Sequence, residues 1–65
     1  MNIKTSYDVM RGADLIARCC CLSEAMSECR ERGYLSTEGV EIHKTYHDKT
    51  ITRTIAVYNV YGEVI

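Results

Sequence analysis

The sequence contains no proline, tryptophan or phenylalanine, and it has no long run of apolar residues. Without proline or low-complexity segments, nothing in it is typical of a linker, so a single domain over residues 1–65 is expected. A transmembrane helix needs roughly 20 consecutive apolar residues, and we therefore expect no membrane span. The first residues also lack the charged and then apolar pattern of an export signal, which favours a cytoplasmic location.

An excess of charge of one sign is also missing. Eight basic and nine acidic residues are interspersed along the chain and give a formal net charge of −1. A protein that contacts the phosphates of nucleic acid usually has a surplus of Lys and Arg. Nucleic acid is therefore not expected as a partner. Binding by a sheet would require the four cations Lys4, Arg18, Lys44 and Arg53 to lie on one face.

The clearest pattern in the sequence is that of an amphipathic helix. Steps of 100° per residue place four apolar side chains in one narrow stripe, which consists of Leu22, Ala25, Met26 and Cys29. Basic residues follow in the last turn, and Gly33 stands where a left-handed residue ends many helices. We predict one helix that has one buried face and ends before Gly33.

The residues before this helix allow two interpretations. Side chains in 3–10 alternate in character, as in a strand, and a short turn would join this strand to a second strand at 15–20. Alternatively, the helical spacing of apolar residues extends upstream, and 14–32 form one long helix. The hairpin is favoured because an alternating strand needs an antiparallel neighbour. In addition, Glu24 lies three residues after Cys21, where a capping box has its carboxylate.

Two further strands are predicted after the helix. The first covers 40–47, and the second covers 50–58, where β-branched residues are densest. Ile55 and Val57 are expected on one face of the second strand and Tyr58 on the other. The expected fold is a small two-layer α+β domain with the order ββαββ, in which the helix packs on an antiparallel sheet. The long helix would give βαββ instead.

The four cysteines do not have the spacing of a metal site. Structural zinc sites usually contain pairs such as Cys-x-x-Cys, which are missing here, so neither a metal nor a cofactor is expected. Cys19 and Cys29 are predicted to be buried and Cys20 to be exposed. Cys21 is a candidate reactive thiol, because the N-terminus of a helix lowers the pKa of a thiol. An alternative function is therefore a thiol-based redox or metal-binding domain.

The histidines and tyrosines suggest binding and not catalysis. His43 and His47 alternate with apolar residues on an exposed sheet face, without a recognisable catalytic set around them, so an enzyme is not expected. Tyr58 and Tyr61 combine apolar area with a hydroxyl, as contact residues often do. These four residues are the predicted partner-binding positions.

The function predicted from these observations is that of a small intracellular protein-binding module. Its partner would be another protein, and unpaired strand edges can also join two copies as a homodimer. Short chains without a catalytic set are typical of accessory and inhibitor proteins of phages and other mobile elements, and this association predicts such a role for the chain.

Overall fold

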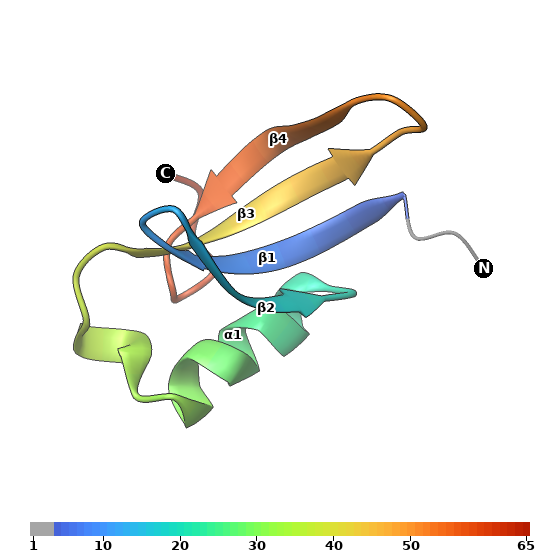
Figure 1. Cartoon of the computed structure of the whole chain (residues 1–65). Coiled ribbons are helices and arrows are strands. Elements are labelled where there is room, and N and C mark those ends of the chain that lie inside the picture. The colour runs from blue at the N-terminus through green and yellow to red at the C-terminus, as the bar shows by residue number, and fades with distance from the viewer. Residues whose placement is uncertain (1–3) are drawn as a thin grey trace.

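The computed structural model describes residues 4–65, which fold into a sheet with a helix packed on it (Figure 1). In chain order the elements are β1 (Thr5–Arg11), β2 (Asp14–Cys19), α1 (Leu22–Glu31), the short 3-10 helix η1 (Tyr34–Ser36), β3 (Val40–His47) and β4 (Thr52–Tyr58). The sheet has four antiparallel strands in the order β2-β1-β3-β4. The predicted ββαββ fold is confirmed, and the long helix over 14–32 is wrong. Ile3, within the first predicted strand, lies outside the described residues.

The helix begins and ends where the sequence predicts. Cys21 is the N-cap with an extended backbone, at φ −148° and ψ 164°, although its side chain forms no capping hydrogen bond. Gly33 follows the last turn with φ +73°, in the left-handed region that glycine adopts readily. The helix has ten residues, and in the part of the chain that the structure describes no helix is long and apolar enough to cross a membrane.

The hydrophobic core lies between α1 and one face of the sheet. Its buried members are Val9, Cys19, Ala25, Cys29, Val40, Ile42 and Val60. Leu22 and Met26 pack against this cluster and are partly buried, so the predicted apolar stripe of the helix is confirmed. The sequence pattern does not predict Val60 as a core residue. It reaches the core because the chain turns back after β4 towards α1.

The faces predicted for β4 are wrong. A shift in the pairing of β3 with β4 lies between Lys44 and Thr45. Beyond it Tyr58 pairs with Ile42, and because opposite residues share a face, Tyr58 lies on the side of the core. Ile55, which the shift leaves without a partner in β3, is 47% exposed. The irregularity changes the phase of the alternation, which a simple period of two does not anticipate.

The turn after β4 contacts the helix through a glycine. Gly62 has φ +83°, and a Cβ atom at this position would lie 2.6 Å from Sδ of Met26. We expect Gly62→Ala to lower the free energy of unfolding by about 2 kcal/mol, since a left-handed alanine and the displacement of Met26 each cost about 1 kcal/mol. Gly39→Ala is the matched control, because Gly39 has φ +82° and a Cβ atom there would meet nothing within 4 Å. Urea denaturation measures the free energy of unfolding of both variants. If Gly62→Ala and Gly39→Ala lower it by the same amount, a contact between the turn and α1 is contradicted.

Candidate functional site on the open face of the sheet

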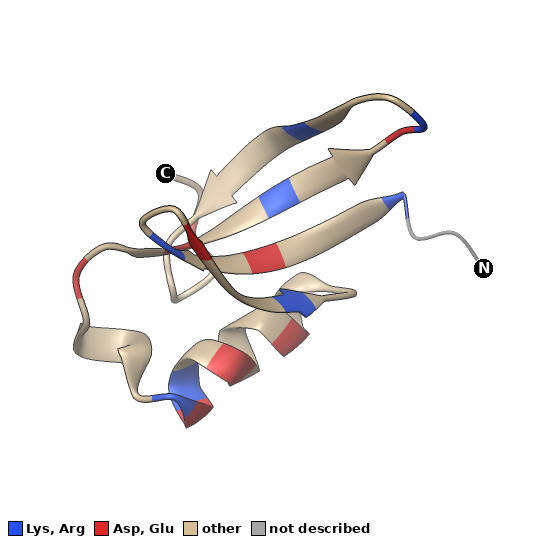
Figure 2. Ribbon diagram, viewed as in Figure 1, with Lys and Arg blue, Asp and Glu red and all other residues tan. Residues whose placement is uncertain are grey.

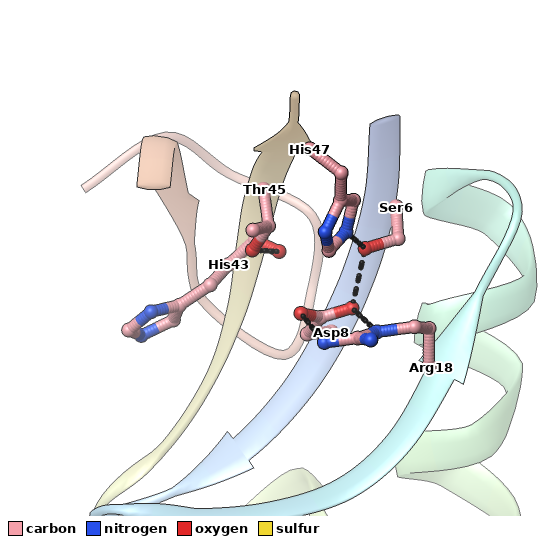
Figure 3. Close-up of polar contacts among 6 residues, drawn as sticks. All are labelled: Ser6, Asp8, Arg18, His43, Thr45 and His47. Atoms are coloured by element: carbon pink, nitrogen blue, oxygen red, sulfur yellow. Dashed lines mark hydrogen bonds and ion pairs between the residues drawn. The ribbon is translucent and has the colours of Figure 1, made fainter. Parts of the chain in front are cut away.

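The face of the sheet opposite α1 is called the open face here. Successive side chains of a strand point to opposite faces, so Ser6 and Asp8 lie on the open face while Val9 lies in the core. The strand register places Asp8 beside Arg18 of β2 and beside His43 of β3. Figure 3 shows the resulting group of polar side chains on these three strands. Its members are Ser6, Asp8, Arg18, His43, Thr45 and His47.

Asp8 and Arg18 form a two-pronged ion pair across β1 and β2. Nε of Arg18 lies 3.1 Å from Oδ1 of Asp8, and Nη2 lies 3.1 Å from Oδ2. The aspartate side chain is 5% exposed, whereas the arginine side chain is 51% exposed. The carboxylate is thus enclosed, while the guanidinium remains accessible from solvent.

Two opposing effects set the ionisation of Asp8. Burial on its own raises the pKa of the carboxyl group, but hydrogen bonds from Arg18 and Ser6, the charge of Arg18 and a weaker contribution of Thr45 lower it. The lowering effects prevail, and the pKa of Asp8 lies below its ordinary value of 3.8. The hydrogen bond to Asp8 also raises the pKa of Arg18, so both members of the pair are charged at neutral pH.

Ser6 links this ion pair to His47. Its fully buried hydroxyl oxygen lies 2.7 Å from Oδ1 of Asp8 and 2.8 Å from Nε2 of His47. An ionised carboxylate can only accept hydrogen bonds, so Ser6 donates its proton to Asp8. The serine oxygen then accepts from an N–H at Nε2 of His47. Through these contacts, residues from β1, β2 and β3 hold one another in place.

This order of residues differs from that of a catalytic triad. In a triad the histidine accepts the proton of the serine, and the carboxylate orients the histidine. Here the hydroxyl lies between the other two groups, its proton points to Asp8, and the imidazole donates to the serine. The arrangement therefore does not activate Ser6 as a nucleophile. It fixes a polar surface, and no buried side-chain nitrogen or oxygen within residues 4–65 lacks a hydrogen-bond partner.

His43 and His47 both lie on the open face, but their rings have different partners. Nε2 of His43 lies 3.1 Å from Oε1 of Glu41, and the side chain of His43 is 25% exposed. His47 instead contacts Ser6, near the end of β3. Figure 3 shows the two rings pointing to different parts of the face. They contribute to one surface without forming one compact site.

The two tyrosines predicted to bind a partner lie elsewhere. Tyr58 is half-buried on the core side, and its ring centroid lies 6.2 Å from that of Tyr7. Tyr61 is exposed in the turn after β4, and its hydroxyl donates to the carbonyl oxygen of Leu35 at 3.0 Å. Neither residue joins His43 and His47 on the open face. The four predicted positions thus do not form a single surface.

Sequence reasoning misses the residues that organise the open face, namely Ser6, Asp8, Arg18 and Thr45. The alternation of residues 3–10 does place Ser6 and Asp8 together on one side. Nothing in that alternation indicates that this side is buried, because the burial depends on side chains of β2 and β3. The one available signal is the opposite charge of Asp8 and Arg18 on the two predicted strands. A regular hairpin would not pair them, because Asp8 lies three residues before Arg11 and Arg18 four residues after Asp14, and a register shift between Val9 and Met10 brings them opposite each other.

The cysteines lie as predicted, and all four are free thiols. Cys19 and Cys29 are buried, and burial raises the pKa of Cys19 to about 11 and also raises that of Cys29. Cys20 and Cys21 are exposed. The hydroxyl of Ser23, 3.2 Å from Sγ of Cys21, lowers the pKa of that thiol, and nearby first-turn N–H groups act in the same direction.

Cys21 is expected to be the fastest of the four thiols to react with iodoacetamide at neutral pH. Its pKa is lowered and its sulfur is accessible, whereas Cys19 and Cys29 are enclosed. Peptide mass spectrometry after brief alkylation measures the order of modification. Ser23→Ala should slow the reaction of Cys21 without affecting that of Cys20. Equal rates for Cys20 and Cys21 would contradict the effect of Ser23.

Metal-ligating and cationic side chains are dispersed. Within the described range 4–65, no group of three His, Cys, Asp or Glu side chains is placed to hold a metal ion. Among the cations, Arg18 pairs with Asp8 on the open face. Lys44 and Arg53 lie on the face of the sheet that carries the core. Nζ of Lys44 lies 5.7 Å from the ring centroid of Tyr7, and Cζ of Arg53 lies 5.9 Å from the ring centroid of Tyr46. The arrangement required for nucleic-acid binding by one face of the sheet is therefore not present.

Comparisons with known proteins do not assign the chain to a family. No family model matches it, and searches of curated proteins and of solved structures find no match either.

Proposed function

We propose that this chain is a small cytoplasmic protein-binding module without enzymatic activity, and that its open face contacts the partner protein. One observation carries the proposal. The open face presents a connected polar network, yet in the described part of the chain α1 and η1 both lie on the other side of the sheet (Figures 1 and 3). Side chains that are already fixed lose less conformational entropy when a partner binds. The network thus supports a recognition surface.

The chemistry of the open face suits a polar protein surface. The accessible groups include the guanidinium of Arg18 and the imidazole of His43, which can donate hydrogen bonds, and the carboxylate of Glu41 beside His43, which can accept them. Asp8 neutralises Arg18, so the centre of the face has little net charge. Arginine is enriched at protein interfaces, where it combines hydrogen bonding with a flat surface. A role as an accessory or inhibitor protein of a phage or other mobile element belongs to the same proposal, on the ground of small size alone.

A matched pair of variants tests the role of the open face. His43→Glu adds a negative charge to the open face, and Arg30→Glu adds the same residue at an exposed position of α1. Each tagged protein is used for affinity capture from the native cell, followed by quantitative mass spectrometry. We expect a protein captured by the wild type and by Arg30→Glu to be lost with His43→Glu. Capture that is equal for both variants, with unchanged circular dichroism, would contradict binding through the open face.

The exposed thiol favours a second candidate function. Cys21 has a lowered pKa and lies at the start of α1, as expected for a thiol-based redox domain. Oxidation by hydrogen peroxide followed by mass spectrometry tests this alternative. Preferential oxidation of Cys21 with a change in oligomeric state supports it, and oxidation without any structural consequence contradicts it.

A further inference from the structure

The face of the sheet that carries the core is only partly covered by α1. Among residues 4–65 the helix packs chiefly against β1 and β2 and less against β3 (Figure 1). Four side chains at the other end of this face are called the cation–tyrosine surface here, and they are Tyr7, Lys44, Tyr46 and Arg53. Arg53 is exposed and the other three are half-buried. This part of the face is therefore accessible from solvent.

The strand register brings these four side chains together. Tyr7 of β1 pairs with Lys44 of β3, and Tyr46 of β3 pairs with Arg53 of β4. Opposite residues share a face of the sheet, and so do residues two positions apart in one strand. Each cation thus lies beside a tyrosine ring, and the surface combines flat aromatic area with two positive charges.

Neither cation of this surface is neutralised by a carboxylate of the described residues. The ion pairs found within residues 4–65 belong to Arg18, Arg32 and His43. Lys44 and Arg53 instead lie near the limit of about 6 Å at which a cation is attracted to an aromatic ring. Figure 2 shows them as the blue segments on the neighbouring strands β3 and β4, where Arg53 is the single charged residue of β4. Their charge favours an anionic ligand.

We propose that the cation–tyrosine surface binds an acidic, extended segment of another protein, with two of its carboxylates paired to Lys44 and Arg53. The two cations lie on adjacent strands and two positions apart, so their Cα atoms are about 8 Å from each other. Every second side chain of an extended segment points to the same side, at a spacing of about 7 Å. Carboxylates at alternate positions can therefore reach both cations. The rings of Tyr7 and Tyr46 offer flat apolar area to the rest of the segment.

Single-stranded nucleic acid also combines flat groups with negative charge, but the surroundings disfavour it. It has a phosphate at every nucleotide and is usually bound in a continuous positive groove. Here the acidic residues of α1 are close, because burial raises the pKa of Cys19, the neighbour of Tyr7 in β2, and the charges of Glu24 and Glu28 add to this effect. A segment with two carboxylates can bind at the cations and avoid these charges.

The cation–tyrosine surface and the open face lie on opposite sides of the sheet. This inference therefore goes beyond the proposed function and does not depend on partner binding through the open face. A test that changes only Arg53 leaves Asp8, Arg18 and His43 as they are.

Fluorescence anisotropy with the full chain tests the ligand. The probe is a fluorescein-labelled peptide of alternating glutamate and threonine, and the control peptide has glutamine in place of glutamate. We expect the acidic peptide to bind and the glutamine peptide not to bind. The affinity should fall as sodium chloride is added, because salt screens the charges of an exposed surface. No binding of the acidic peptide at about 1 mM chain, or equal binding of both peptides, would overturn the proposal.

A matched pair of variants tests the position of the site. Arg53→Glu and Arg30→Glu make the same change of charge at exposed positions of β4 and α1. We expect Arg53→Glu to weaken binding of the acidic peptide at least about fivefold with unchanged circular dichroism, because repulsion replaces attraction, and Arg30→Glu to weaken it less than about twofold. Equal effects of the two variants would overturn the site. Tighter binding of a labelled oligothymidylate than of the acidic peptide would overturn the choice of ligand in favour of single-stranded nucleic acid.

Discussion

Replacement of Ile42 by alanine is expected to lower the free energy of unfolding by about 2–5 kcal/mol. Ile42 is fully buried in the centre of β3, where it pairs with Val9 on one side and Tyr58 on the other. Removal of its side-chain carbons leaves a cavity under α1. A domain of 65 residues has only a few kcal/mol of net stability, so much of the variant should be unfolded at 25 °C. Urea denaturation followed by circular dichroism measures the loss.

Ile55→Ala provides the matched control for this substitution. Ile55 is 47% exposed in β4, so the same chemical change should cost no more than about 0.5 kcal/mol. The sequence pattern alone groups Ile55 with Val57 on one face of the strand and does not indicate that Ile55 is exposed. Similar losses for the two variants would contradict the position of the core.

Asp8→Ala is expected to cost about 2–3 kcal/mol, the largest effect of any substitution on the open face. The change removes the acceptor for the buried hydroxyl of Ser6 and the partner of Arg18. The expected cost is below that of a fully buried ion pair because Arg18 is half exposed and water can solvate it. Urea denaturation of Asp8→Ala, Arg18→Ala and the double variant yields the energy of interaction between Asp8 and Arg18.

Asp14→Ala is the control for the loss of an aspartate. Asp14 is an exposed residue at the start of β2 and forms no ion pair within the described residues. Its replacement should change the free energy of unfolding by no more than about 0.5 kcal/mol. If Asp8→Ala and Asp14→Ala have equal effects, the network on the open face does not contribute to stability.

The lowered pKa of Asp8 also predicts a dependence on pH. Its carboxyl group binds a proton less readily in the folded chain than in the unfolded chain. The stabilisation is therefore complete above the ordinary pKa of 3.8, and it is lost as the pH falls through the lower pKa of the folded state. When the free energy of unfolding is measured by urea denaturation between pH 5 and pH 2, it should decline less for Asp8→Ala than for the wild type. Parallel curves would contradict this role of Asp8.

The elements that are predicted correctly are those with local signals. The apolar stripe from Leu22 to Cys29 defines the buried face of α1, and Gly33 marks its end. The alternation in 40–47 likewise identifies β3, and it places His43 and His47 on the face opposite Ile42. Such patterns involve residues close together in the chain, so no knowledge of neighbouring strands is needed to read them.

The features that the sequence pattern misses depend on contacts between distant residues. The faces of β4 follow from an irregularity beside Lys44 and Thr45, which the sequence does not mark with glycine. The burial of Asp8 depends on Arg18 in the adjacent strand, and the hydrogen bond from His47 to Ser6 spans 41 positions. The sequence therefore predicts the strand that carries the histidines, but not the network that organises the open face.

Site-specific photocrosslinking in the native cell tests the central proposal most directly. A benzophenone amino acid is introduced at His43 on the open face and, as the control, at the exposed position of Glu24 on α1. We expect a discrete crosslinked product with another protein from position 43 and none from position 24. No product from position 43, or the same product from both positions, would contradict partner binding through the open face.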